Sequence, residues 1–112
     1  GVSFIVNADG RTTFSLPVRT VSASDSPVLV STADAMILVD SSQGPVTVRL
    51  PNAGSVGDGR VFAIKDKGDG ALNTVKIEAS GSGKIDDESE LLADDNFSGA
   101  IVVSGGGDYW IV

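Results

Sequence analysis

Short apolar and β-branched runs, separated by turns rich in Gly, Asn, Asp and Ser, make up most of this chain. Residues 36–39 are apolar on both faces of a strand, whereas residues 46–50 alternate apolar and polar positions until Pro51 ends the run. Period-two alternation is typical of a strand with one face in water. Because turn signals recur at roughly 8–12 residues, the pattern predicts an all-β fold, an antiparallel β-sandwich that is jelly-roll-like.

The beginning of the chain predicts a hairpin. Residues 3–6 and 11–16 are β-rich runs, and Asp9-Gly10 between them is a strong turn signal. An extended stretch follows until Asp25-Ser26-Pro27 interrupts it. We therefore divide the chain into an N-terminal hairpin and extended segment, residues 1–27, and a β-sandwich domain, residues 28–112.

The rest of the chain predicts strands at residues 28–31, 60–66, 74–79, 99–104 and 108–112. Residues 86–95 alone have helical character, but they are too short and acidic to form a stable helix, so we expect a loop with one turn or a short strand. The runs at 36–39, 60–64 and 100–103 are apolar on both faces, which is more than a thin sandwich needs. Assembly as a homotrimer would bury the second faces.

Composition narrows the possible functions. The net charge of −7, from 15 acidic and 8 basic residues, disfavours nucleic acid and anionic membranes as partners. The chain has no Cys and no His, which excludes disulfides, thiolate metal sites and an imidazole base. No apolar stretch reaches 18 residues, so we expect no membrane insertion. We expect no enzyme activity, no catalytic residues and no cofactor.

An acidic cluster is the strongest candidate for metal binding. It contains Asp86, Asp87, Glu88, Glu90, Asp94 and Asp95. Ca²⁺ takes six to eight oxygen ligands, but this spacing matches no Ca²⁺ loop motif. We therefore expect a solvated acidic loop and no metal site, with Ca²⁺ binding left as the alternative.

Two further features suggest a binding surface. Tyr109 and Trp110 are adjacent, so on a strand they point to opposite faces; one is expected in the core, and the other faces a ligand or a subunit, unless both pack near a rim. Long loops carry contacts on a rigid scaffold. We predict a binding site at one end of the domain, where polar groups orient a sugar or peptide and an aromatic ring stacks on it, or else loops that only cap the sandwich. The predicted site residues are Asp66, Lys67, Asp69, Asn73 and Trp110.

The order of several short motifs resembles a β domain that recurs in bacteriophage tail-fibre and head-fibre proteins. The motifs are Ile37-Leu38-Val39-Asp40, residues 44–51, Gly57-Asp58-Gly59-Arg60-Val61, Ile64-Lys65-Asp66, Val75-Lys76-Ile77, Gly83-Lys84-Ile85-Asp86 and Tyr109-Trp110-Ile111-Val112. Residues 7–17 also resemble a segment of phage fibre proteins. The chain departs from the family pattern at residues 84–87, where Lys-Ile-Asp-Asp replaces Ile-Asp-Gly.

The resemblance implies a virion appendage, usually homotrimeric, at the virion surface. The function it favours is that of a non-enzymatic phage structural protein, a fibre or receptor-binding domain for host attachment. Its partners would be other virion proteins and a bacterial surface glycan or protein. A capsid decoration or head-fibre protein that binds the capsid lattice is the alternative. A carbohydrate-binding module or glycosidase is the third hypothesis.

Overall fold

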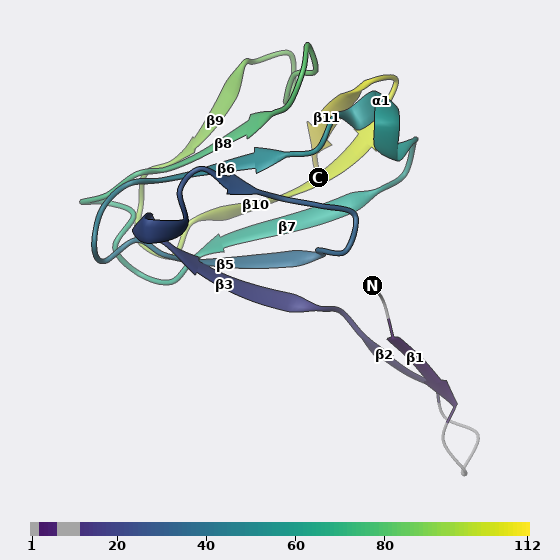
Figure 1. Ribbon diagram of the computed structural model, residues 1–112, viewed down its shortest axis with the longest axis horizontal. Helices are drawn as coiled ribbons and strands as arrows, with labels where there is room; N and C mark the ends of the chain where they lie inside the picture. The colour runs from purple at the N-terminus through teal and green to yellow at the C-terminus, as the bar shows by residue number, and fades with distance from the viewer. Residues whose placement is uncertain (1–2, 7–11) are drawn as a thin grey trace.

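The computed structural model describes residues 3–6 and 12–112, with side chains from Leu16 onward. This part of the chain is mostly β-sheet (Figure 1). Helical structure within it is limited to the 3₁₀ turn η1 (Ala23–Asp25) and the four-residue helix α1 (Ala53–Val56). No helix among the described residues is long and apolar enough to cross a membrane.

The predicted N-terminal pairing is confirmed. Strands β1 (Ser3–Val6) and β2 (Thr12–Ser15) are antiparallel, with Phe4 opposite Phe14. The predicted turn at Asp9-Gly10 lies outside the described residues. The two strands extend away from the main sheets (Figure 1).

The larger sheet has five strands in the order β11-β10-β7-β5-β3. They are β3 (Val18–Ser22), β5 (Met36–Asp40), β7 (Val61–Asp66), β10 (Gly99–Gly105) and β11 (Asp108–Ile111). Strands β3, β5 and β7 run parallel to one another, whereas β10 is antiparallel to both β7 and β11. The edge strand β3 belongs to residues 1–27, the segment that the sequence analysis divided from the β-sandwich domain.

The smaller sheet has four strands in the order β4-β6-β8-β9. They are β4 (Val28–Leu29), β6 (Val46–Leu50), β8 (Val75–Ala79) and β9 (Glu90–Ala93). The pairs β4–β6 and β6–β8 are parallel, and β8–β9 is antiparallel. Strand β9 is the short strand that was one of the expected alternatives for residues 86–95.

The prediction of antiparallel sheets was wrong, because both main sheets are mixed. From β3 to β8 the chain alternates between the sheets, so strands that neighbour each other within a sheet are two apart in sequence. The chain reverses direction twice between two such strands, so they run parallel. A tight turn gives the same sequence signal whether the next strand pairs with the first or joins the other sheet. The jelly-roll likeness, which requires antiparallel strands, fails for the same reason.

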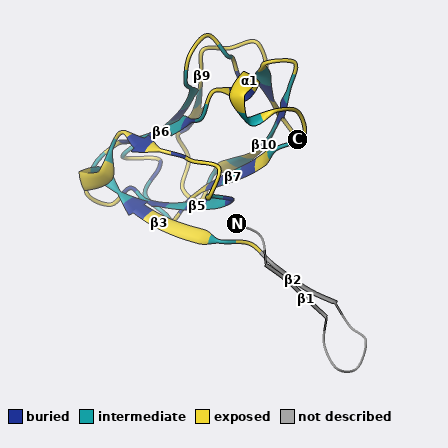
Figure 2. Cartoon of the chain, turned by 45° about the vertical axis from the view of Figure 1, so that its right-hand side comes forward, coloured by how far each residue is buried: buried dark blue, intermediate teal, exposed yellow. Residues whose placement is uncertain are grey.

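Both sheets contribute side chains to one hydrophobic core (Figure 2). The five-stranded sheet supplies Ile37, Val39, Phe62, Ile64, Val102 and Tyr109, and the four-stranded sheet supplies Val46, Val48, Leu50, Val75 and Ile77. Helix α1 covers one end, where the sequence predicts only a loop. Its Asn52 side chain accepts a hydrogen bond from the Gly54 N–H at 3.0 Å, and Ala53 joins the core.

Candidate functional site

Four predicted site residues lie at one end of the molecule, where β7 ends and the loop of residues 67–73 begins. Asp66, the last residue of β7, is only 1% exposed, so its carboxylate cannot meet a ligand at the surface. Lys67 is exposed and Asp69 is partly buried. The Asn73 side-chain amide donates to the Ser41 carbonyl at 2.7 Å. Of these four predicted residues, only Lys67 is therefore fully exposed.

The Asp66 carboxylate holds this end together. Its Oδ1 accepts a hydrogen bond from the Ser41 hydroxyl at 2.6 Å. Its Oδ2 accepts from the backbone N–H groups of Gly68, Gly70 and Phe97, at 3.1, 2.9 and 3.0 Å. Segments from three parts of the chain thus meet at one buried side chain.

The pKa of Asp66 reflects these contacts. Burial by itself raises the pKa of the carboxyl. The hydrogen bonds from Ser41, Gly70, Phe97 and Gly68 together lower the pKa by more than burial raises it, so the net pKa is below the usual 3.8. The carboxylate is therefore ionised at neutral pH and serves the fold.

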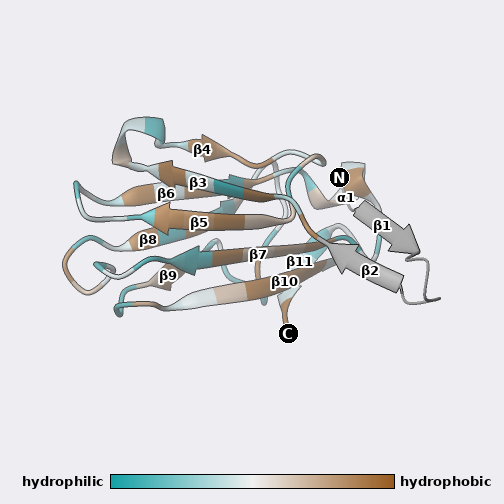
Figure 3. Ribbon diagram, turned by 90° about the horizontal axis from the view of Figure 1, so that it is seen from below, coloured by the Kyte–Doolittle hydropathy of each residue, from teal (hydrophilic) through white to brown (hydrophobic). Residues whose placement is uncertain are grey.

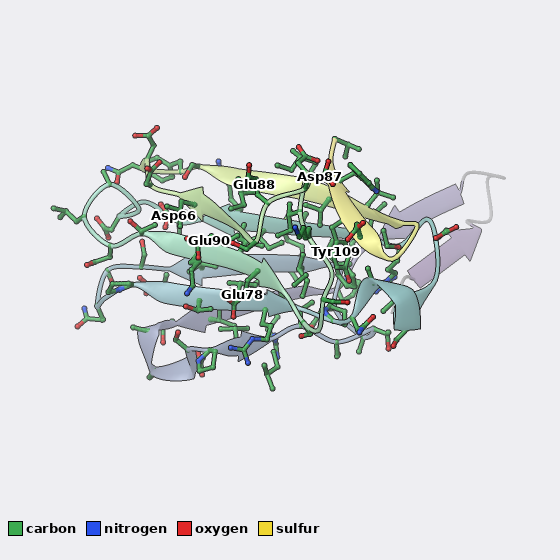
Figure 4. All side chains as sticks on the ribbon, turned by 90° about the horizontal axis from the view of Figure 1, so that it is seen from above. Asp66, Glu78, Asp87, Glu88, Glu90 and Tyr109 are labelled. Atoms are coloured by element: carbon green, nitrogen blue, oxygen red, sulfur yellow. The ribbon has the colours of Figure 1, made fainter. Side chains whose placement is uncertain are left out.

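The predicted grouping of Trp110 with these loops was wrong. Trp110 on β11 pairs with Val103 on β10, and Val103 pairs with Val61, the first residue of β7. Asp66 is the last residue of β7, so Trp110 lies level with the opposite end of that strand. Its indole N–H donates to the Gly105 carbonyl at 3.0 Å. Figure 4 shows the neighbouring Tyr109 far from Asp66. Because β10 is antiparallel to β7, the turn that carries the aromatic pair falls at the opposite end of the sheet.

The prediction that Tyr109 and Trp110 point to opposite faces is confirmed. Tyr109 is fully buried, with its ring edge-on to Phe62 at 6.2 Å between centroids and its hydroxyl donating to the Pro51 carbonyl. Burial raises the pKa of Tyr109 to about 12 despite the positive charge of Arg60. Trp110 lies on the outer face of the five-stranded sheet.

That outer face is apolar along most of its width. The outward positions follow from the register of strands whose other side chains enter the core. Six of its side chains, including those of the two flanking residues, are between 40% and 75% exposed. Figure 3 shows the hydrophobic character of these strands. We call this surface the apolar sheet face; it comprises Val18, Met36, Leu38, Val61, Ala63, Ile101, Val103 and Trp110, flanked by Leu16 and Val112.

Two shallow hollows lie on the apolar sheet face. Both are lined by Met36, Ala63 and Ile101; one continues towards Lys65 and the other towards Arg60. The Arg60 guanidinium lies over the Phe62 ring at 4.9 Å and donates to the carbonyls of Thr32 and Asp34. Three charged side chains stand at outward strand positions of this sheet within the described residues, Asp40, Lys65 and Asp108, and each lies at or next to the end of its strand.

The outer face of the four-stranded sheet is charged. Arg49 Nε lies 2.9 Å from Glu78 Oε1, and Lys76 Nζ lies 3.8 Å from Glu78 and 3.9 Å from Glu90. Figure 4 looks onto this side, where Glu78 and Glu90 are labelled. We call this surface the charged sheet face.

The loop end presents an aromatic residue that the sequence analysis missed. Phe97 is 60% exposed and has φ of +61°. Its ring lies against Gly68, where an added Cβ would come within 3.4 Å of it. The only sequence signal for Phe97 is a single aromatic residue in an otherwise polar, turn-rich segment.

The acidic segment contributes to the fold. Asp86 Oδ1 accepts a hydrogen bond from the Ile111 N–H at 2.9 Å, which links the segment to β11. Within residues 3–6 and 12–112, no group of three or more acidic side chains is arranged to hold a metal ion.

No protein-family model matches the chain, and no curated protein matches it.

Proposed function

We propose that this protein is a non-enzymatic structural protein of a bacteriophage virion, a fibre or receptor-binding domain for host attachment that assembles as a homotrimer. The observation that carries the proposal is the apolar sheet face. Monomeric proteins rarely expose large contiguous apolar patches, and such patches mark contacts with other proteins. A second copy offers a matching, largely apolar surface, whose charged positions lie at or next to the strand ends.

The proposal includes a β-sandwich as the subunit. The shared core between the five-stranded and four-stranded sheets supports it. Three copies would turn their apolar sheet faces inward and leave their charged sheet faces in water. The net charge of −7 per chain would keep such an assembly soluble at high copy number.

The use of titratable groups inside the fold supports a structural role. Asp66 and Tyr109 both have shifted pKa values, and such groups are often catalytic. Here both groups make hydrogen bonds within the chain and connect distant segments. These hydrogen bonds thus stabilise the loops around Asp66 and the core around Tyr109.

Two measurements test the proposal. Sedimentation velocity at micromolar concentration should give three times the chain mass of 11.4 kDa; a monomer or a dimer would refute the trimer. Binding of the labelled protein to bacteria and to capsids tests the role. Saturable binding to one bacterial strain supports attachment, whereas binding only to capsids stripped of decoration would favour the capsid-lattice alternative.

A further inference from the structure

We propose that Phe97, with the loops of residues 67–73 and 94–98 around it, forms a contact site for a neutral or amino sugar. We call this site the Phe97 platform. It rests on the proposed attachment function, and it lies at the loop end, beside the end of the apolar sheet face that Lys65 marks.

The backbone of Phe97 is the first indication. A bulky residue with positive φ is a genuine outlier, and here the ring is 60% exposed, so burial in a core does not explain it. Strained residues of this kind concentrate at binding and active sites.

The ring is held in place by its surroundings. The buried Asp66 carboxylate accepts from the Phe97 N–H at 3.0 Å, and the Lys65 ammonium donates to the Phe97 carbonyl. One side of the ring rests on Gly68, whose φ of +151° suits glycine. The rest of the ring is open to solvent.

The two loops of the platform are joined to each other. The Ala71 N–H donates to Asn96 Oδ1 at 3.0 Å. At Gly70 an added Cβ would lie only 2.5 Å from the Asp95 carbonyl oxygen, so the loops touch through their backbones. A ligand that binds such fixed loops loses little free energy to ordering them.

The chemistry around the ring favours a saccharide. An aromatic face packs against the C–H face of a sugar ring, and flanking polar groups bond its hydroxyls. The charged residues of these two loops are Lys67, Asp69, Asp94 and Asp95. Three carboxylates beside one ammonium, which also interacts with the Asp40 carboxylate, repel anionic ligands, which leaves neutral and amino sugars. In a trimer, three platforms would add avidity.

The test uses a microarray of bacterial surface polysaccharides that includes neutral and amino sugars, probed with the full-length labelled protein. The wild type should bind at least one of them. Phe97→Tyr keeps the ring and should retain binding, whereas Phe97→Leu keeps apolar area without the ring and should weaken binding about tenfold or more.

Phe97→Asn separates binding from folding, since Asn tolerates the left-handed conformation well. It should lose binding while its Tm stays at or above that of the wild type. A Tm several degrees lower would show that the ring serves the fold and overturn the proposal. So would wild-type binding by the Leu or Asn variant, a wild type that binds no polysaccharide, or cell binding that survives periodate oxidation of surface sugars.

The same samples distinguish this inference from the proposed trimer. A monomeric wild type whose saccharide binding depends on Phe97 would refute the trimer and leave the platform standing. A trimeric wild type that binds bacteria independently of Phe97 would refute the platform alone.

Discussion

The outer faces of the two sheets differ sharply although both sheets contribute to the same core. On β6 and β8 the outward positions are Thr47, Arg49, Lys76 and Glu78, whereas on β5 and β7 they are mostly aliphatic. The core determines only the inward half of each strand. The outward half depends on what the face contacts, and here we propose water on one side and a protein partner on the other.

Charges placed on the apolar sheet face should have the largest effect. The double variant Val61→Asp/Ile101→Asp would bury unpaired carboxylates in the proposed interface, which costs several kcal/mol per subunit, so the trimer should dissociate at micromolar concentration. Both side chains are about half exposed in the single chain, so the subunit should stay folded. Sedimentation velocity and circular dichroism measure the two properties.

The matched control is Thr47→Asp, which adds a charge to the charged sheet face and should leave the mass unchanged. If the double variant remains trimeric, the interface lies elsewhere. If Thr47→Asp dissociates the trimer, the two faces have been assigned the wrong roles.

Folding stability should depend on buried contacts more than on either outer face. Asp66→Asn replaces an acceptor of four hydrogen bonds by an amide that cannot satisfy all of them. We expect a loss of about 3 kcal/mol in the free energy of unfolding. Asp69→Asn, its control in the adjacent loop, should change it by about 0.5 kcal/mol or less. Urea unfolding that gives equal effects would contradict the structural role of Asp66.

Stability should also fall in acid because of Asp66. Its pKa is lower in the folded chain than the usual 3.8, so folding favours the ionised form. This contribution is fully present above the unfolded pKa and is lost as the pH falls through the folded pKa. Urea midpoints should therefore decline below about pH 4, and less steeply in Asp66→Asn. An identical decline in both proteins would assign the acid sensitivity to other carboxylates.

The sequence predicted the strands well but not their partners. Alternation and turn residues are local, so β5, β6, β8 and the β10–β11 hairpin were located nearly to the residue. Whether a strand pairs with its predecessor or joins the other sheet depends on contacts between distant residues. Local signals do not contain that information, and the sheets were therefore predicted to be antiparallel.

The site was predicted less well for a related reason. Loop composition grouped Asp66, Lys67, Asp69 and Asn73 at the end of β7, where they do lie, but a carboxylate looks the same in sequence whether it faces water or accepts four internal hydrogen bonds. Asp66 was therefore assigned to the surface. Trp110 was placed at the wrong end because the sequence does not give the strand order. Phe97 was missed because its N–H bonds to Asp66, which lies 31 residues away in the sequence, and local signals do not reveal such a contact.

The smallest effect is expected from the ion pairs of the charged sheet face. Arg49 and Glu78 lie opposite each other on β6 and β8, with side chains 39% and 24% exposed. Water screens such a pair, so a double-mutant cycle with Arg49→Ala and Glu78→Ala should give a coupling free energy of about 0.2–1 kcal/mol that shrinks at high salt. The oligomeric state should not change. A salt-insensitive coupling above about 2 kcal/mol would mean that the pair is shielded from water, and the charged sheet face would then be a second covered surface.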